Sequence, residues 1–292
     1  MGPGLYLNLD IDEYHGDTES ISKTGLDDIN TCPALYWARH LDPDRPPPRE
    51  RTGQLEGTLA HCAILEPKEF AKRFCELPKD APRRPSEAQL NAKKNSPESL
   101  EAIQWWASWN AKHQDLTIVT HAQAETAWRQ ADAVDRIPEI SDVLKNGQAE
   151  VSACWRDTVT GELCRCRPDW VFKLDDGSVI LLDVKTFASA APDEFRRQIA
   201  RKRYHVQAAY YSNGYALASG LTVRGFVFLT VESEYPYLAS ALMLDEDGIV
   251  SGEVAYRRNL DTYSQCKRTG VWPSYSEEIA IVSLPSWAAE KD

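Results

Sequence analysis

Apolar and polar positions change their spacing several times between residues 125 and 231, and the order of these changes predicts the core of the fold. A helical pattern over Glu125–Asn146 gives way to alternation over Glu150–Trp155. Strands follow over Cys164–Lys173 and Val179–Lys185, then a helix from about Pro192 to Ser219 and a strand over Val223–Val231. The order is αβββαβ, which predicts an α/β fold with a mixed central sheet flanked by helices.

The segments on either side of this core are less regular. Before it, helices are expected from Ser22, a plausible N-cap, to about Arg39 and over Gln54–Leu65, and a third carries the tryptophans of residues 100–113. After it, we expect a strand over Tyr237–Leu244, a helix to about Lys267 and a docking tail. We interpret 1–292 as a single domain, with a mostly helical part (1–120), a core (121–231) and a C-terminal strand, helix and tail (232–292).

Three polar residues stand out on the two central strands. The turn Asp175–Ser178 joins these strands, and the second one ends with Asp183 and Lys185, which share a face because they are two residues apart. The first strand delivers Asp169 just after Pro168. Asp183 and Lys185 alone would be read as an ion pair at a strand end. A second carboxylate beside them adds surplus negative charge, which a divalent cation would neutralise.

The sequence around these residues resembles a known family. Pro168-Asp169 followed by Asp183-Val184-Lys185 matches the PD-(D/E)XK nuclease signature, and the wider text is similar to the exonuclease VIII (RecE-type) family. The resemblance covers almost the whole chain in order. It includes Ile21–Lys23, Leu26–Asp28, Pro33–Tyr36, Gly57-Thr58, His61-Cys62, Leu65–Pro67, Glu69-Phe70, Cys164–Asp169, Arg203–Gln207, Leu284-Pro285 and Trp287-Ala288.

The resemblance implies a restriction-endonuclease-like fold and a metal site. His61, in the pattern Gly57-x-x-x-His61, would be a metal ligand together with Asp169, Asp183 and the backbone carbonyl of Val184. Gly57 would allow a close approach of its helix to the site, although helix packing alone could also explain this glycine. Related nucleases place an extra acid near the metal, for which Glu150 is the candidate, and an exposed glutamate at a strand end is an equally good reading.

A further pair of polar residues lies on the helix that follows Asp183 and Lys185. Gln207 and Tyr211 are one helical turn apart, so both can address one point. By itself the spacing would indicate core packing. The resemblance implies that this Q-x-x-x-Y motif lies by the active centre and the DNA strand.

The net charge of −11 counts against a generic nucleic-acid coat protein, because phosphates attract basic residues. The distribution of charge matters more than its sum. One dense basic run is available for phosphate contacts, although a solvated basic face is the default for any single member. It consists of Arg196, Arg197, Arg201, Lys202 and Arg203.

Seven irregularly spaced cysteines suggest reduced thiols and a cytoplasmic protein, and neither a signal peptide nor an apolar run long enough to cross a bilayer is present. Taken together, the residues and the resemblance predict an enzyme, a Mg²⁺- or Mn²⁺-dependent deoxyribonuclease. Hydrolysis would proceed by in-line attack of a water molecule that the metal activates, with Lys185 orienting that water.

The resemblance further implies processive 5′→3′ digestion of double-stranded DNA ends, which leaves 3′ overhangs for a single-strand annealing protein. It also implies a ring-shaped homotetramer around the DNA. Two alternatives remain open, a structure-specific endonuclease or resolvase on the same fold and a non-catalytic scaffold that binds DNA ends.

Overall fold

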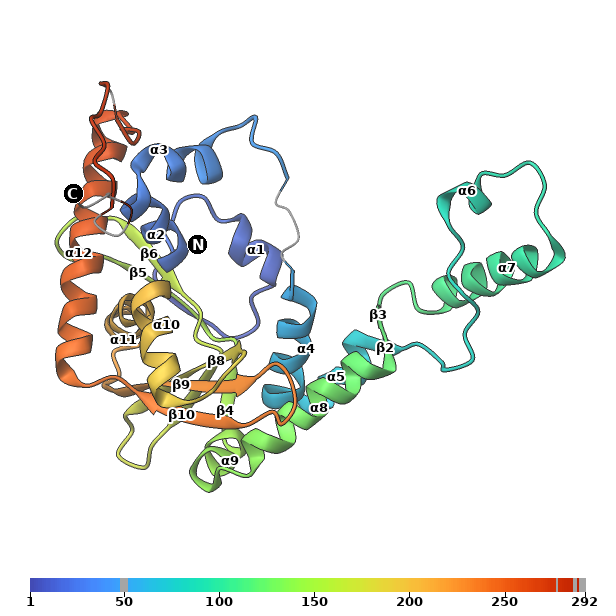
Figure 1. Ribbon diagram of the computed structural model, residues 1–292. Coiled ribbons are helices and arrows are strands. Elements are labelled where there is room, and N and C mark those ends of the chain that lie inside the picture. Colours follow the sequence, from blue (N-terminus) through green and yellow to red (C-terminus); the bar gives the residue numbers. More distant parts are fainter. Residues whose placement is uncertain (48–51, 277, 286–287, 289–292) are drawn as a thin grey trace.

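A computed structural model describes residues 1–47, 52–276, 278–285 and 288; Trp287, part of the resemblance above, lies outside them. Its centre is a five-stranded sheet of order β10-β9-β8-β7-β4 (Figure 1). Only β8 and β9 are parallel; the other neighbours are antiparallel. The strands are β4 (Gly147–Ala149), β7 (Trp170–Lys173), β8 (Val179–Phe187), β9 (Val223–Glu232) and β10 (Ala239–Met243).

Two smaller sheets accompany the central one. An antiparallel sheet of order β1-β5-β6 is built from β1 (Gly4–Tyr6), β5 (Ser152–Arg156) and β6 (Leu163–Cys166). A parallel pair consists of β2 (Phe74–Glu76) and β3 (Thr117–Val119).

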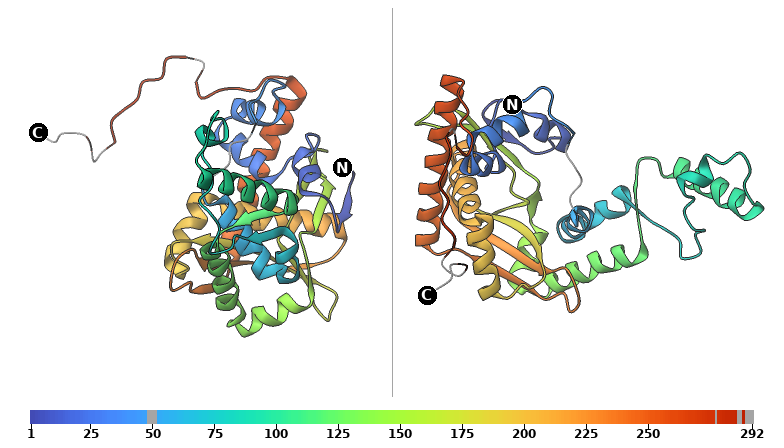
Figure 2. Two further views of the ribbon diagram at one scale, coloured as in Figure 1. Left: turned by 90° about the vertical axis from the view of Figure 1, so that its right-hand side faces the viewer. Right: turned by 45° about the horizontal axis from the view of Figure 1, so that its top comes forward.

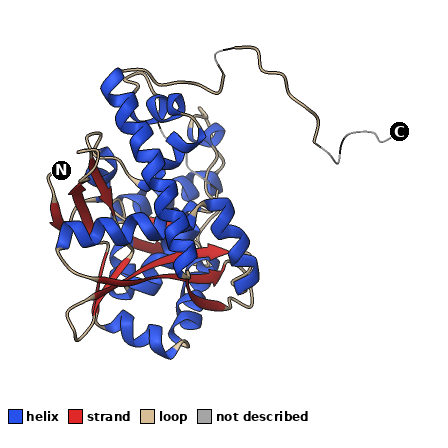
Figure 3. Cartoon of the chain, turned by 90° about the vertical axis from the view of Figure 1, so that its left-hand side faces the viewer, coloured by secondary structure: helices blue, strands red, loops and turns tan. Residues whose placement is uncertain are grey.

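Helices cover both faces of the central sheet (Figures 2 and 3). One face carries α10 (Pro192–Lys202), α11 (Tyr204–Ser219) and α12 (Glu246–Thr269), and the other carries α4 (Gln54–Leu65), α8 (His121–Asp135) and α9 (Pro138–Lys145). The shorter helices are α1 (Ile11–Gly16), α2 (Lys23–Thr31), α3 (Pro33–Tyr36), the π-helix Trp37–Leu41, the 3₁₀ turn Pro67–Glu69, α5 (Phe70–Arg73) and α6 (Glu87–Leu90); α7 (Pro97–Lys112) is longer. No helix in the described part of the chain is long and apolar enough to cross a membrane.

Alternation along β8 and β9 divides the core into two clusters. Leu181 and Phe228 pack with residues of α11 such as Ala208, whereas Leu182 and Val184 face the α4 side and pack with Ala60 and its neighbours. Because side chains alternate across a strand, Asp183 and Lys185 point to the α11 side, and the neighbouring Val184 points to the α4 side.

Two strand predictions need correction: the strand over Cys164–Lys173 is broken in its middle, and the strand predicted from Glu150 begins only at Ser152. The Cys164–Lys173 segment forms β6 and β7, which belong to different sheets, and Arg167–Asp169 connects them. Glu150 does not begin a strand; it lies between β4 and β5 with a left-handed φ of 55°. The physical reason is that Pro168 cannot donate to a strand ladder and Glu150 leaves the extended region. The Glu150 amide donates to the Asp169 carbonyl at 3.0 Å, so the two breaks lie side by side.

Three predicted helices are interrupted as well. The Pro192–Ser219 helix breaks at Arg203, whose φ is 55°, and this residue separates α10 from α11. The helix expected from Ser22 to Arg39 ends at Thr31, and that over Glu125–Asn146 is divided before Pro138. Pro33 and Pro138 each open a new helix, where the missing N–H is not needed. The predicted N-cap is confirmed, because the Ser22 hydroxyl accepts from the Gly25 amide at 3.3 Å.

Two helical glycines should respond oppositely to substitution. A Cβ at Gly214 in α11 would lie 2.2 Å from the Trp155 ring, whereas at Gly57 it meets none of the described atoms within 4 Å. The idea that Gly57 permits a close approach is therefore wrong. We expect Gly214→Ala to lower the free energy of unfolding by about 1–3 kcal/mol through overpacking. Gly57→Ala should raise it by about 0.5–1 kcal/mol through helix propensity. Urea denaturation measures both, and equal effects would contradict the packing.

Candidate active site

The end of β8 presents a buried carboxylate with two partners. Asp183 is 3% exposed. One of its oxygens forms an ion pair with the Lys185 ammonium, and the other accepts a hydrogen bond of 2.5 Å from the Gln207 side-chain amide on α11. Both carboxylate oxygens of Asp183 are therefore engaged on the α11 side of the sheet.

Lys185 keeps its charge although it is largely buried. Burial alone would lower the pKa of its ammonium, but the Asp183 and Asp169 carboxylates outweigh burial and leave that pKa raised. The ammonium also lies 4.9 Å from the centre of the Tyr204 ring, a cation–π distance. A positive charge is thus fixed beside the acids.

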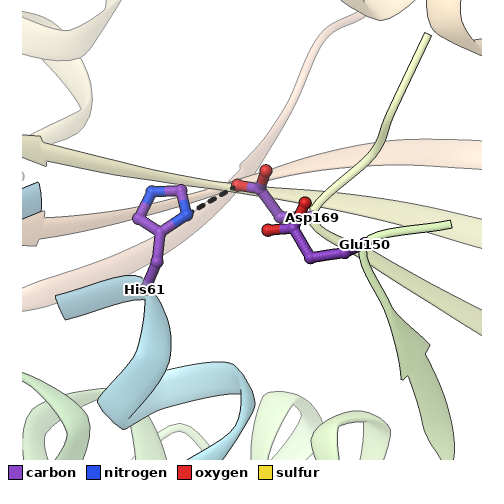
Figure 4. Close-up of side chains that lie close together, drawn as sticks. All are labelled: His61, Glu150 and Asp169. Carbon is purple, nitrogen blue, oxygen red and sulfur yellow. Dashed lines mark ion pairs between the residues drawn. The ribbon is translucent and has the colours of Figure 1, made fainter. Parts of the chain in front are cut away.

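A second group of side chains forms a candidate metal site. His61, Glu150 and Asp169 each offer one ligand atom, and these atoms lie within 4.8 Å of one another (Figure 4). The three residues come from α4, from the break between β4 and β5, and from the break between β6 and β7. The His61 Nδ1 atom is 3.4 Å from Asp169 Oδ2 (Figure 4).

Val184 holds two members of this group through its backbone. Its N–H donates to Asp169 Oδ2 at 2.7 Å, and its carbonyl is 3.1 Å from His61 Nε2. A carbonyl can only accept, so Nε2 carries the proton and Nδ1 presents its lone pair toward Asp169. A backbone carbonyl that orients the far nitrogen of a histidine is a common support for a metal ligand.

The acids of the site repel one another. Burial, and then the nearby Asp183 carboxylate, raise the pKa of Asp169 well above its usual range. Burial, and then the Asp169 charge, raise the pKa of Glu150 to about 7, although the Arg167 guanidinium opposes the change. Burial also lowers the pKa of His61, which favours the neutral imidazole. Neutral imidazole and carboxylates are metal ligands, and a divalent cation would relieve the repulsion. The donor set therefore fits such a cation, which His61, Glu150 and Asp169 would hold.

Most of the residues predicted for the site converge, but their contacts differ from the prediction. Glu150, the candidate for the extra acid, lies within the cluster, whereas Asp183 faces Lys185 and Gln207 and is not one of the three grouped ligands. The Val184 carbonyl, predicted as a metal ligand, faces His61. The roles of Asp183 and Val184 as metal ligands stay predictions.

Only one residue of the Q-x-x-x-Y pair contacts the site, and only part of the basic run lacks an acidic partner among the described residues. Gln207 reaches Asp183, but the partly buried ring of Tyr211 packs edge-on against Phe226 at 5.9 Å. In the basic run, Arg196, Arg197 and Arg203 form ion pairs with Asp193, Glu194 and Asp27 respectively. Arg201 and Lys202 are exposed and have no acidic partner among the described residues.

Sequence reasoning missed two residues that support the site. Arg167 forms an ion pair of 2.9 Å with Glu150 and donates to the Leu9 carbonyl at 2.8 Å, which fixes the acid beside Asp169. Tyr204 lies against Lys185. The position of Arg167, two residues before Asp169, was a usable signal, whereas the aromatic contact of Tyr204 depends on the helix break at Arg203.

Comparisons with known proteins identify the family and the fold of the chain. The chain belongs to the family described as PDDEXK-like domain of unknown function (DUF3799), whose sequence model matches residues 22–285. A solved structure described as "Putative exonuclease" from Eubacterium rectale is similar over 96% of both chains, with a TM-score of 0.59 and 13% identity. This likeness shows the same fold, and the prediction of a restriction-endonuclease-like αβββαβ core is confirmed.

A second solved structure is much less similar. The alkaline exonuclease of Laribacter hongkongensis has 12% identity and a TM-score of 0.28, with 63% of this chain and 88% of that chain covered. No curated protein matches the sequence. The match to the PDDEXK-like family supports membership of the PD-(D/E)XK nuclease superfamily.

The stability that a metal confers should depend on pH. In metal-free protein Glu150 holds its proton up to about pH 7 instead of 4.5, so its favourable contribution to stability is lost as pH rises through that interval. Metal ligation needs the deprotonated acids. We therefore expect Mn²⁺ to raise the melting temperature much more at pH 8 than at pH 5, and Asp169→Asn to abolish the rise. Differential scanning fluorimetry with and without EDTA measures it, and an equal rise at both pH values would count against the site.

Proposed function

We propose that this protein is a metal-dependent deoxyribonuclease that hydrolyses phosphodiester bonds. The observation that carries the proposal is the convergence of two groups on the Asp183–Lys185 end of β8. One group, His61, Glu150 and Asp169, offers metal ligands, and the other holds the charged ammonium of Lys185. The site thus offers ligands for a metal ion and, separately, the fixed positive charge of Lys185. Both would stabilise the negative charge that develops on oxygen during phosphodiester hydrolysis.

Each residue has a role in this proposal. A divalent cation, when bound, would stabilise charge on the phosphoryl oxygens and make a water molecule more acidic. Lys185 orients the attacking water and offsets the developing negative charge. Asp183 holds that ammonium in place and would serve as a further ligand, together with the Val184 carbonyl, and Gln207 fixes the rotamer of Asp183. Tyr211 would help to position the strand, and the run Arg196–Arg203 would contact phosphates.

Finer properties rest on the family resemblance. We propose an exonuclease VIII (RecE-type) enzyme that uses Mg²⁺ or Mn²⁺ and digests double-stranded DNA processively from 5′ ends. Its 3′ overhangs would serve recombination through a single-strand annealing protein. A cytoplasmic homotetramer of single nuclease domains is part of the same proposal. The Eubacterium rectale structure is described as a "Putative exonuclease", which supports the exonuclease part of this proposal.

Lys185 should matter for chemistry and not for metal binding. We expect Lys185→Ala to lower kcat on linear duplex DNA by about 10²–10³-fold, because a preorganised charge is lost at the reacting phosphate. Stabilisation by Mn²⁺ should persist in this variant, whereas Asp169→Asn should lose both properties. Lys173→Ala, an exposed lysine at the end of β7, is the control. Wild-type rates in Lys185→Ala would remove this residue from the mechanism.

The form of the DNA separates the enzyme classes. We expect linear duplex to be degraded with Mg²⁺ and covalently closed circular duplex to be spared, because an exonuclease needs an end. Gels of duplex labelled on each strand in turn report the polarity. Nicking or linearisation of the circle would instead indicate a structure-specific endonuclease. No hydrolysis of either DNA over a Mg²⁺ and Mn²⁺ titration would favour the non-catalytic scaffold.

A further inference from the structure

A separate arm leaves the body of the protein between β2 and β3. Residues 77–116 run outward, form α6 and α7 and return to the parallel pair (Figures 1 and 2). None of the three hydrophobic clusters includes a residue of this arm. In α7, which carries three tryptophans, only Trp106 is buried. The arm therefore adds little to the packing of the body.

The arm has an ordered structure of its own. The Trp106 indole N–H donates to the Pro82 carbonyl at 2.9 Å, and the Arg84 guanidinium lies 5.2 Å from the same ring. Gln89 at the end of α6 donates to the Ser99 hydroxyl of α7 at 3.1 Å. These contacts hold the segment before α7 against the helix, so the side chains of that segment are displayed on a fixed support.

The charged side chains of this segment are mainly basic. Residues 79–94 contain five basic and two acidic residues in a chain whose net charge is −11. All five basic residues are exposed, and none forms an ion pair with a described residue, unlike Arg196, Arg197 and Arg203 on the body. We call this group the arm patch; it consists of Lys79, Arg83, Arg84, Lys93 and Lys94.

We propose that the arm patch binds the phosphate backbone of duplex DNA several base pairs away from the active site; this inference rests on the proposed function. A chain with excess negative charge repels a polyanion, so the approach of DNA needs local positive charge. Basic side chains that no acid neutralises can contact phosphates without first breaking an ion pair. The sixteen residues of α7 span ~24 Å, which corresponds to roughly seven base pairs of duplex. The arm contacts phosphates, not base edges, so it adds affinity without sequence preference.

Salt dependence of binding tests the proposal directly. The arm variant is Lys79→Gln, Arg83→Gln, Lys93→Gln and Lys94→Gln, with Arg84 kept because it packs on Trp106. A matched control removes the same charge from exposed residues of the body: Lys145→Gln, Lys173→Gln, Arg224→Gln and Arg268→Gln. Binding of a fluorescent 40-base-pair duplex is measured in EDTA, which prevents cleavage, over a series of salt concentrations.

The arm variant should lose about 0.9 from the slope of log K against log salt for each phosphate contact removed, hence up to about 3.6 for four. We expect its affinity near 0.15 M salt to fall at least about tenfold, and the control to differ from wild type much less. A charge-preserving variant (Lys79→Arg, Arg83→Lys, Lys93→Arg, Lys94→Arg) should restore both the slope and the affinity. An arm variant that is folded by circular dichroism and matches the control in slope would overturn the proposal.

Hydrolysis of bis(4-nitrophenyl) phosphate separates failure of this inference from failure of the proposed function. This small diester cannot contact the arm while it is bound in the active site. With Mn²⁺, the arm variant and wild type should therefore hydrolyse it at the same rate. Equal loss of diester and DNA cleavage in the arm variant would mean that the substitutions disturb the active site, and would contradict the proposal. Absence of hydrolysis in wild type would refute the nuclease function, whereas the binding result in EDTA would still decide the role of the arm.

Discussion

The backbone of Val184 is the constraint on which the site depends. Its N–H donates to Asp169 and its carbonyl orients His61, while the side chains on either side of it, Asp183 and Lys185, point to the opposite face of the sheet. One residue of β8 thus joins a helix on one face to the ion pair on the other. Val184 pairs with Leu229 of β9, whereas the ladder between β8 and β7 ends at Leu182, so the N–H and carbonyl of Val184 contact Asp169 and His61.

The charges of the site are balanced only in part. Asp183 is matched by Lys185, and Glu150 is restrained by Arg167, but the pKa of Asp169 stays well above its usual range because burial and Asp183 disfavour its charged form. An arrangement of this kind is unfavourable for folding unless something compensates the acids. Ligand atoms of His61, Glu150 and Asp169 within 4.8 Å of one another indicate where a cation would do so. The same buried acids would then account both for the unfavourable free energy in the metal-free protein and for the capacity to bind a metal.

The distribution of charge explains how an acidic chain could handle an acidic substrate. Basic residues on the body are often neutralised, as Arg197 is by Glu194 and Arg203 by Asp27. The five basic residues of the arm patch have no acidic partner in the part of the chain that the structure describes. The body would then supply the chemistry and the arm the affinity, an arrangement that lets the site keep its carboxylates without losing attraction for phosphate.

The sequence determined the αβββαβ order, the Ser22 cap, and the shared face of Asp183 and Lys185, because each follows from local periodicity or spacing. It indicated His61 only through resemblance, since 123 positions separate this residue from Val184. The breaks at Glu150 and Pro168 were decided by the tertiary structure. A left-handed φ at a glutamate has no local signature, and it persists because the Glu150 amide is bonded to Asp169 across the paired bends. Those bends turn a strand-end glutamate into a member of the candidate metal site.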